Sequence, residues 1–162
     1  MSGVGLQITL NSAPLQGALA RLAERGEQRL GLMEQIGAAL LLSTQMRFEA
    51  ERGPDGNPWP PSIRALAEGG KTLRDDGQLV GSLTYSATNE GVEIGTNVIY
   101  AAIHQQGGTI KAKSADNLTF RIGDRWISKA EVTIPARPFL GIDDDDMTEI
   151  AAILSDYLAG AA

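Results

Sequence analysis

The chain has 162 residues, 43% hydrophobic and 21% charged, which is typical of one globular domain and excludes wholesale disorder. It contains no cysteine and a single histidine, which excludes disulfides, thiol nucleophiles and metal sites built from cysteines or several histidines. The formal net charge of −6 argues against general nucleic-acid binding. We therefore expect a single domain over residues 1–162.

The N-terminal part predicts one strand followed by a long helix. Apolar and polar residues alternate over residues 4–10, the period of a half-buried strand. Apolar residues then recur every three or four positions from Leu15 to Phe48, which predicts a helix. Gly26 costs about 1 kcal/mol relative to alanine inside a helix, so we expect a kink there or two consecutive helices. The apolar stripe indicates either a core face or a seam between subunits.

Residues 51–62 hold four prolines and two glycines, which end the helix in an ordered or semi-ordered loop. Trp59 stands between Pro58 and Pro60, where a flexible linker does not usually carry tryptophan. Two interpretations stay open at this point. Trp59 is either a lid over the core or an anchor on a partner.

The middle of the chain predicts hairpins around one short helix. Alternation over residues 83–87 and 92–96 indicates a β-hairpin. We expect Asn97 to cap a short helix that ends at Gly107-Gly108. Residues 109–132 predict a second hairpin, long and protruding.

An extended segment and a helix complete the chain. Two prolines keep residues 134–141 extended, since proline disfavours helix at the preceding residue. Asp143–Asp146 suit the N-terminus of the last helix, and their spacing is not that of a calcium-binding EF-hand loop. Its expected apolar face is Met147, Ile150, Ala151, Leu154, Tyr157 and Leu158. The predicted fold is α+β: one antiparallel sheet packed with a long N-terminal helix and a C-terminal helix, plus a protruding hairpin.

No catalytic motif is recognisable. His104 has no serine in a Gly-x-Ser-x-Gly turn to activate, so we interpret it as a buried or interface histidine. Neither a Walker A loop nor a dinucleotide fingerprint is present. No pair of carboxylates stands out on an apolar background, although 20 acidic residues leave many combinations. We predict that the protein is not an enzyme and has no metal site.

The charges are unevenly distributed. Residues 141–162 carry six acidic and no basic groups, which accounts for the entire net charge. Residues 107–140 carry six basic groups against three acidic. This separation suits head-to-tail contacts, in which a basic part of one copy meets the acidic end of another.

Four groups of short motifs follow one another over more than half of the chain. They are Arg47-Phe48 with Gly56 and Trp59-Pro60; KTL, GQL and SL within residues 71–83; VEIGT and YAAIHQ with Gly107-Gly108; and IPARPFLG over residues 134–141. The last two groups are the most specific. In this order they resemble the virion morphogenesis, or tail completion, family of Mu-like and related contractile-tailed phages.

The resemblance implies a structural role at the neck or head-proximal end of the tail, which it completes so that a filled head can join. It implies the α+β fold of small neck and tail-terminator proteins, which often form rings, and no cofactor. The implied partners are other neck and tail proteins and further copies of the chain, with a hexamer as the favoured ring. The implied location is the virion, after assembly in the host cytoplasm. The sequence also argues against membrane association, because apolar runs such as Ala38–Leu42 are far shorter than the ~20 residues of a membrane span.

The resemblance also suggests which residues make contacts. Five of them would fix the corner between the short helix and the following loop, and residues 135–140 would form a rigid strap. Phe139 and Leu140 would bury in the chain's own sheet or in a neighbouring subunit. The full set of interaction candidates is Trp59, Tyr100, His104, Gln105, Gly107, Gly108, Pro135, Ala136, Arg137, Pro138, Phe139 and Leu140.

Two other functions stay open from the sequence. The first is a DNA-contacting protein of the neck channel, whose basic residues line a lumen around packaged DNA. Those residues would be Lys111, Lys113, Arg121, Arg125 and Lys129. The second is a cell-wall hydrolase associated with the tail.

Overall fold

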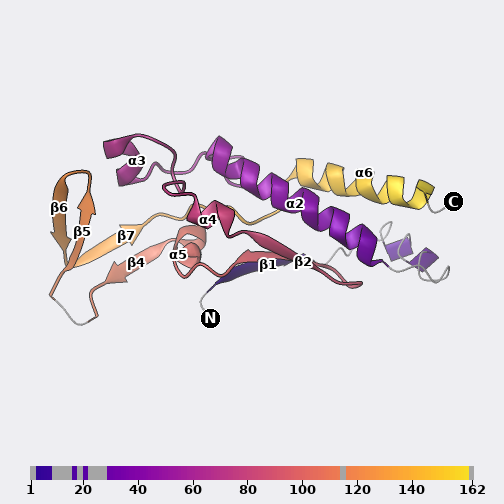
Figure 1. Cartoon of the computed structure of the whole chain (residues 1–162), viewed down its shortest axis with the longest axis horizontal. Helices are drawn as coiled ribbons and strands as arrows, with labels where there is room; N and C mark the ends of the chain where they lie inside the picture. The colour runs from indigo at the N-terminus through magenta and orange to yellow at the C-terminus, as the bar shows by residue number, and fades with distance from the viewer. Residues whose placement is uncertain (1–2, 9–15, 18–19, 22–28, 114–115, 161–162) are drawn as a thin grey trace.

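The computed structural model describes residues 3–8, 16–17, 20–21, 29–113 and 116–160. The helices are α2 (Leu30–Ala50), α3 (Ile63–Glu68), α4 (Gln78–Gly81), α5 (Ala101–Gln106) and α6 (Asp144–Gly160). The strands are β1 (Val4–Ile8), β2 (Thr84–Ala87), β3 (Val92–Thr96), β4 (Gly108–Lys111), β5 (Leu118–Ile122), β6 (Arg125–Lys129) and β7 (Glu131–Ile134). The predicted α+β class is confirmed (Figure 1). The predicted weak point at Gly26 lies outside the described residues.

A three-stranded antiparallel sheet and two long helices form the body of the molecule. The strand order is β1-β3-β2, so β3 is the central strand. Its residue Ile94 pairs with Leu6 of β1 on one edge and with Tyr85 of β2 on the other. Helix α2 packs against β2 and β3 and against α6, so that it lies between the sheet and α6 (Figure 1). At Gly37 the helix approaches the Tyr85 ring so closely that a Cβ atom would overlap it, which only glycine permits.

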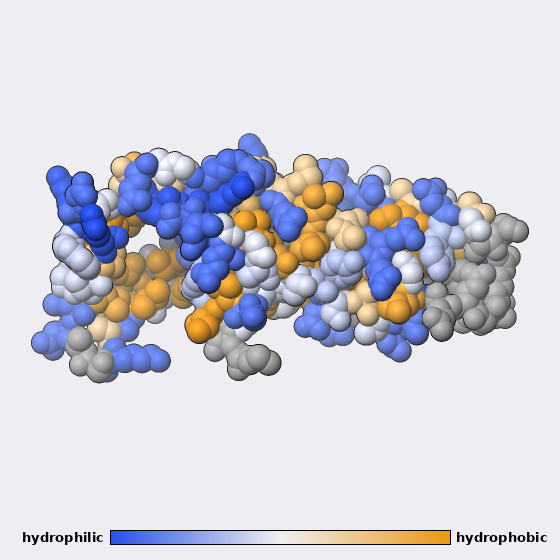
Figure 2. Space-filling model, viewed as in Figure 1, coloured by the Kyte–Doolittle hydropathy of each residue, from blue (hydrophilic) through white to orange (hydrophobic). Residues whose placement is uncertain are grey.

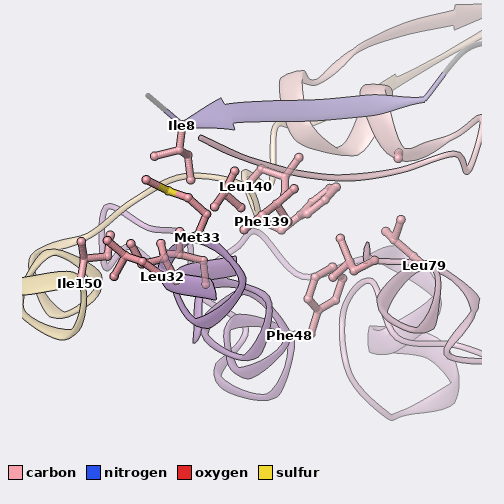
Figure 3. Packing of buried hydrophobic residues seen from close by; sticks show 14 of the residues in the cluster. Ile8, Leu32, Met33, Phe48, Leu79, Phe139, Leu140 and Ile150 are labelled. Carbon is pink, nitrogen blue, oxygen red and sulfur yellow. The ribbon is translucent and has the colours of Figure 1, made fainter. Parts of the chain in front are cut away.

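The core sits where α2 crosses the sheet. The apolar stripe predicted for this helix is confirmed as a core face: Met33, Leu40 and Phe48 are buried. Side chains from β1, α4, α6 and residues 139–140 converge on the same place (Figure 3). The fully buried members include Leu32, Met33, Ile36, Phe48, Ile94 and Phe139.

The expectation of one antiparallel sheet and one long second hairpin was wrong in detail. The described residues of 108–134 form two separate two-stranded sheets: the pair β4–β7 nearer the body and the hairpin β5–β6 farther out (Figure 1). Six residues join β4 to β5, whereas Ala130 alone joins β6 to β7. Because these two connections differ in length, the hydrogen-bonded pairing of β4 with β7 cannot continue in register into the pairing of β5 with β6. The double ribbon extends away from the long helices, as predicted (Figure 1).

Two further local predictions needed correction. Asn97 does not cap α5, which begins at Ala101; instead the Thr96 hydroxyl accepts a hydrogen bond of 3.1 Å from the Val98 N–H. On α6, Met147 is 50% exposed and Ala151 is also exposed. The buried residues are Asp146 and Ile150, and the middle of the face that they define lies about 80° around the helix from Met147.

The described helices include none that is both long enough and apolar enough to span a bilayer.

Candidate functional site

Residues Pro135–Leu140, which we call the strap, are fixed to the body by the side chain of Gln105. Its Oε1 atom accepts hydrogen bonds from the backbone N–H groups of Phe139 (2.9 Å) and Leu140 (3.0 Å). Its Nε2 atom donates to the Leu140 carbonyl oxygen at 2.9 Å. One side chain therefore satisfies three backbone groups of a segment that forms no regular structure of its own, as such groups require when they leave water.

The proline-rich loop fixes the other side of the strap. The Trp59 Nε1–H donates to the Pro138 carbonyl oxygen at 2.9 Å, and the indole is only 5% exposed. Arg137, also buried, donates from Nε to the Pro60 carbonyl oxygen at 2.6 Å and from Nη2 to that of Pro61 at 3.3 Å. Trp59 is thus a lid over the chain's own core, the first of the two interpretations.

Aromatic packing joins the strap to α2. The Phe48 ring lies 5.4 Å from Trp59, edge to face, and 5.3 Å from Phe139, measured between centroids. Phe139 is fully buried and Leu140 is 5% exposed, so both insert into their own subunit's core (Figure 3). Of the strap residues, only Pro135 and Ala136 are exposed.

The corner after α5 is built around two glycines and the histidine. Gly107 has a φ of +72°, and a Cβ atom there would lie 2.7 Å from the Ala136 nitrogen; a Cβ at Gly108 would lie 2.7 Å from Ile103 Cδ1. The sharp turn lets the His104 carbonyl oxygen accept a 2.7 Å hydrogen bond from the Arg137 N–H. The corner and the strap are therefore joined by this hydrogen bond and by the Gln105 contacts.

His104 is half-buried beside Tyr100, with which it makes an edge-to-face contact at 5.9 Å between ring centroids. Its buried Nδ1 has no hydrogen-bond partner among the described residues. Burial lowers the pKa of His104, and the positive charge of Arg137 lowers it further. The Tyr100 hydroxyl donates to Gln78 Oε1 at 2.9 Å, and the ring remains 40% exposed.

Arg47 is the most heavily bonded side chain of this region, and sequence reasoning assigned it no role beyond its motif. Its Nη1 donates to the carbonyl oxygens of Phe139 (3.3 Å) and Gly141 (2.9 Å). Its Nη2 contacts Asp143 at 2.9 Å and forms a close ion pair with Asp146. The guanidinium therefore joins α2, the end of the strap and the start of α6.

Two of the aspartates at the start of α6, Asp143 and Asp146, cap the helix by hydrogen bonds to each other's backbone. Asp143 Oδ1 accepts from the Asp146 N–H at 2.8 Å, and Asp146 Oδ2 accepts from the Asp143 N–H at 3.1 Å, a reciprocal cap of the helix N-terminus. Burial alone would raise the pKa of Asp143, but the Asp146 N–H and Arg47 outweigh it and hold the pKa below its usual range. Among the described residues, no group of three or more acidic or histidine side chains is arranged to hold a metal ion.

A groove of about 1000 Å³ opens beside this cluster, between the second half of α2, residues 52–56 and the start of α6. Two side chains on its α2 wall, Leu42 and Met46, are 58% and 61% exposed. The lining also includes the acidic Asp55, Asp144, Asp145 and Glu149 and the basic Arg52. The sequence signal for the groove was available, because Leu42 and Met46 are apolar residues outside the buried stripe of α2. In Figure 2 hydrophobic patches interrupt the hydrophilic surface over α2 and α6.

At the opposite end from the C-terminus of α6 lie residues 108–113 and 116–134, which we call the arm (Figure 1). Lys111 pairs with Glu131 at 3.2 Å and Arg121 with Asp124 at 3.0 Å. Within the described part of the chain, Lys113, Arg125 and Lys129 make no ion pair. Hydrophilic and hydrophobic side chains both reach the surface at this end (Figure 2). Trp126 is 72% exposed and Ile110 is 41% exposed.

The Gln105 contacts predict a measurable cost. Gln105→Leu leaves two strap N–H groups and one carbonyl without partners, and unsatisfied buried groups cost about 1–3 kcal/mol each, not fully additively. We expect a loss of roughly 2–4 kcal/mol in the free energy of unfolding, measured by urea titration. Gln106→Leu is the matched control, since Gln106 is exposed and has no hydrogen bond within the described residues. Equal effects of the two substitutions would contradict the role of Gln105.

His104 predicts a pH dependence that can be followed without ambiguity, because it is the only histidine. Since its pKa is lowered in the folded state, the unfolded chain binds the proton first as the pH falls. Stability is therefore expected to decrease as the pH falls through 6.5 toward the folded-state pKa. NMR titration of the imidazole should give a midpoint below the ordinary value near 6.5, and a midpoint at or above that value would refute the prediction.

Comparisons with known proteins show which family the sequence resembles. The model of the Phage virion morphogenesis family matches residues 10–159. Mu-like prophage FluMu G protein 2 of Haemophilus influenzae is 31% identical over 94% of this chain and 95% of its own length. The "Putative capsid assembly protein G" of Escherichia phage Mu is 32% identical over 71% of this chain and 70% of its own. FluMu G protein 1 of H. influenzae is 24% identical over 95% of both chains. No solved structure matches the chain.

The resemblance seen in the short motifs thus extends over residues 10–159, from just after β1 to the last turn of α6. The chain belongs to the Phage virion morphogenesis family.

Proposed function

We propose that this protein completes the phage tail and helps to join it to the head, as a component of the neck or tail terminator. The observation that carries the proposal is the family match over residues 10–159, together with a Mu relative named as a putative capsid assembly protein. The proposed partners are other neck and tail proteins and further copies of this chain in a ring, with a hexamer favoured. The proposed location is the virion neck, reached after assembly in the host cytoplasm.

The architecture suits such a role. Gln105, Trp59 and Arg47 hold the strap by hydrogen bonds within the same chain. The surfaces that we propose for partners are the arm at one end and the groove over α2 and α6. A component that presents two different surfaces in fixed geometry can be repeated by rotation into a closed ring.

The test is a phage or prophage that lacks this gene, examined by electron microscopy. The proposal expects separate filled heads and tails, and expects purified protein added to the lysate to restore joined particles. Joined, infectious particles without the protein would overturn the proposal. The absence of heads would overturn it as well, and would place the function in assembly of the capsid shell.

A second candidate function, contact with packaged DNA in a neck channel, rests on the arm. Of its five basic residues, Lys113, Arg125 and Lys129 are free of ion pairs within the described residues, whereas Lys111 and Arg121 are paired. Three phosphate contacts predict a slope of about −2.7 for the logarithm of the affinity against the logarithm of salt concentration. Fluorescence anisotropy with a DNA duplex between 50 and 200 mM salt measures it. No binding at 50 mM would remove this candidate.

A further inference from the structure

The arm and the groove have complementary chemistry. Trp126 on β6 is the most exposed aromatic ring of the described residues, and its partner in the ladder is Arg121. Because side chains alternate along a strand, Ser128 shares the Trp126 face, while Arg125 and Lys129 project from the opposite face of the same narrow hairpin. The cation on the Trp126 face is therefore its ladder partner Arg121, and an exposed tryptophan beside an arginine is typical of an interface anchor.

The groove offers the opposite features. Leu42 and Met46 supply an exposed apolar wall, and methionine adapts its shape to aromatic partners. Asp144, Asp145 and Glu149 lie at its edge and make no ion pair within the described chain, unlike Asp143 and Asp146, which Arg47 neutralises. Hydrogen bonds from Asn57, first from its side chain, lower the pKa of Asp55 on the facing loop, so this carboxylate also stays charged.

Within one chain the two features do not meet. The arm's nearest neighbour is α3, where the Gly123 N–H donates to Glu68 Oε1 at 2.5 Å. Figure 1 shows the β5–β6 hairpin at one end of the molecule, with α6 running toward the other.

We infer that the tip of the arm, with Trp126 as its anchor, docks into the α2–α6 groove of a second copy of this chain. The contact is heterologous, since each copy uses its arm on one neighbour and its groove on the other, and repetition builds a ring or an open filament. This inference rests on the proposal that the protein self-associates, and it names the surfaces that do so.

Substitutions on the two surfaces test the inference by analytical ultracentrifugation of the purified full chain. Trp126→Ser removes the anchor, and Met46→Glu places a charge on the apolar wall. Each is expected to weaken self-association at least 30-fold, the effect of losing a hot-spot residue. Leu66→Ser is the matched control, because Leu66 is 73% exposed on α3 and lies outside both surfaces. Raising the salt from 50 mM to 1 M is expected to weaken association of the wild type roughly tenfold or more.

Mixing the two variants distinguishes this geometry from others. The Trp126→Ser chain keeps an intact groove, and the Met46→Glu chain keeps an intact arm, so together they form one working contact. The mixture is expected to give a dimer and nothing larger. Failure of the mixture to dimerise, or a wild type that stays at 17.2 kDa at every concentration, would overturn the inference.

Cysteine cross-linking locates the contact directly, because the chain has no cysteine of its own. Ser128 lies on the Trp126 face of the arm and Ser43 lines the groove. A mixture of Ser128→Cys and Ser43→Cys chains is expected to form a disulfide-linked dimer under mild oxidation, while the double variant forms a ladder of multimers. Ser155→Cys, exposed on α6 outside the groove, is the control partner for Ser128→Cys. Equal cross-linking to Ser43→Cys and Ser155→Cys would contradict docking in the groove.

The two proposals fail separately. If the mixed variants dimerise while phage without the protein still joins heads to tails, the docking stands and the tail-completion role falls. If phage assembly requires the protein but Trp126→Ser leaves self-association unchanged, the tail-completion role stands and the docking is refuted.

Discussion

Arg47→Met is expected to lower the free energy of unfolding by about 3–5 kcal/mol, the usual cost of removing one partner from a buried ion pair. Arg47 is 6% exposed and Asp146 is 4% exposed, so the substitution leaves a carboxylate buried without its counter-ion. It also leaves the Phe139 and Gly141 carbonyl oxygens without their donor. Chemical denaturation at pH 7 measures the loss.

Two further variants keep this prediction testable if Arg47→Met does not fold. Arg47→Met with Asp146→Leu removes both charges and is expected to recover part of the lost stability, because an apolar pair can replace a buried ion pair. Arg121→Ala is the matched control: it removes an arginine from an exposed pair with Asp124 and is expected to change stability little. A double variant less stable than the single one would contradict the interpretation of Arg47 as a counter-ion.

Phe139→Ala is expected to cost about 3–5 kcal/mol, as truncations of fully buried phenylalanines usually do. The ring fills the space beside Phe48, and the strap cannot collapse into the cavity because Gln105 holds residues 139 and 140 in place. Thermal and urea unfolding measure the effect.

The control for Phe139→Ala is Trp126→Ala, which removes a larger ring from an exposed position on the arm. It is expected to change the free energy of unfolding by no more than about 0.5 kcal/mol. If both substitutions destabilised equally, Phe139 would not have the core role assigned to it. A stable Trp126→Ala chain also establishes that the loss of self-association predicted for Trp126→Ser does not come from unfolding.

Local patterns were sufficient for most of the secondary structure. The alternation in residues 92–96, the apolar stripe through Leu40 and Phe48 and the aspartates before α6 depend on neighbours within a few positions, so their structure could be predicted. The extended strap follows in the same way from proline's steric constraints. The family was also accessible, because its motifs are short and contiguous.

Tertiary structure alone decided how these pieces meet. Arg47 contacts residues 92 to 99 positions away, and no local pattern shows which carboxylates a buried arginine will find. Trp59 became a lid over the core because its N–H reaches Pro138, 79 residues along the chain. Asp146 is buried against Arg47, whereas Met147, the next residue of α6, is 50% exposed. The sequence by itself determined the helices and strands, the extended strap and the family, because these rest on local sterics and short motifs. Which side chains are buried, and where the arm and the groove lie, depends on long-range packing that only the folded chain provides.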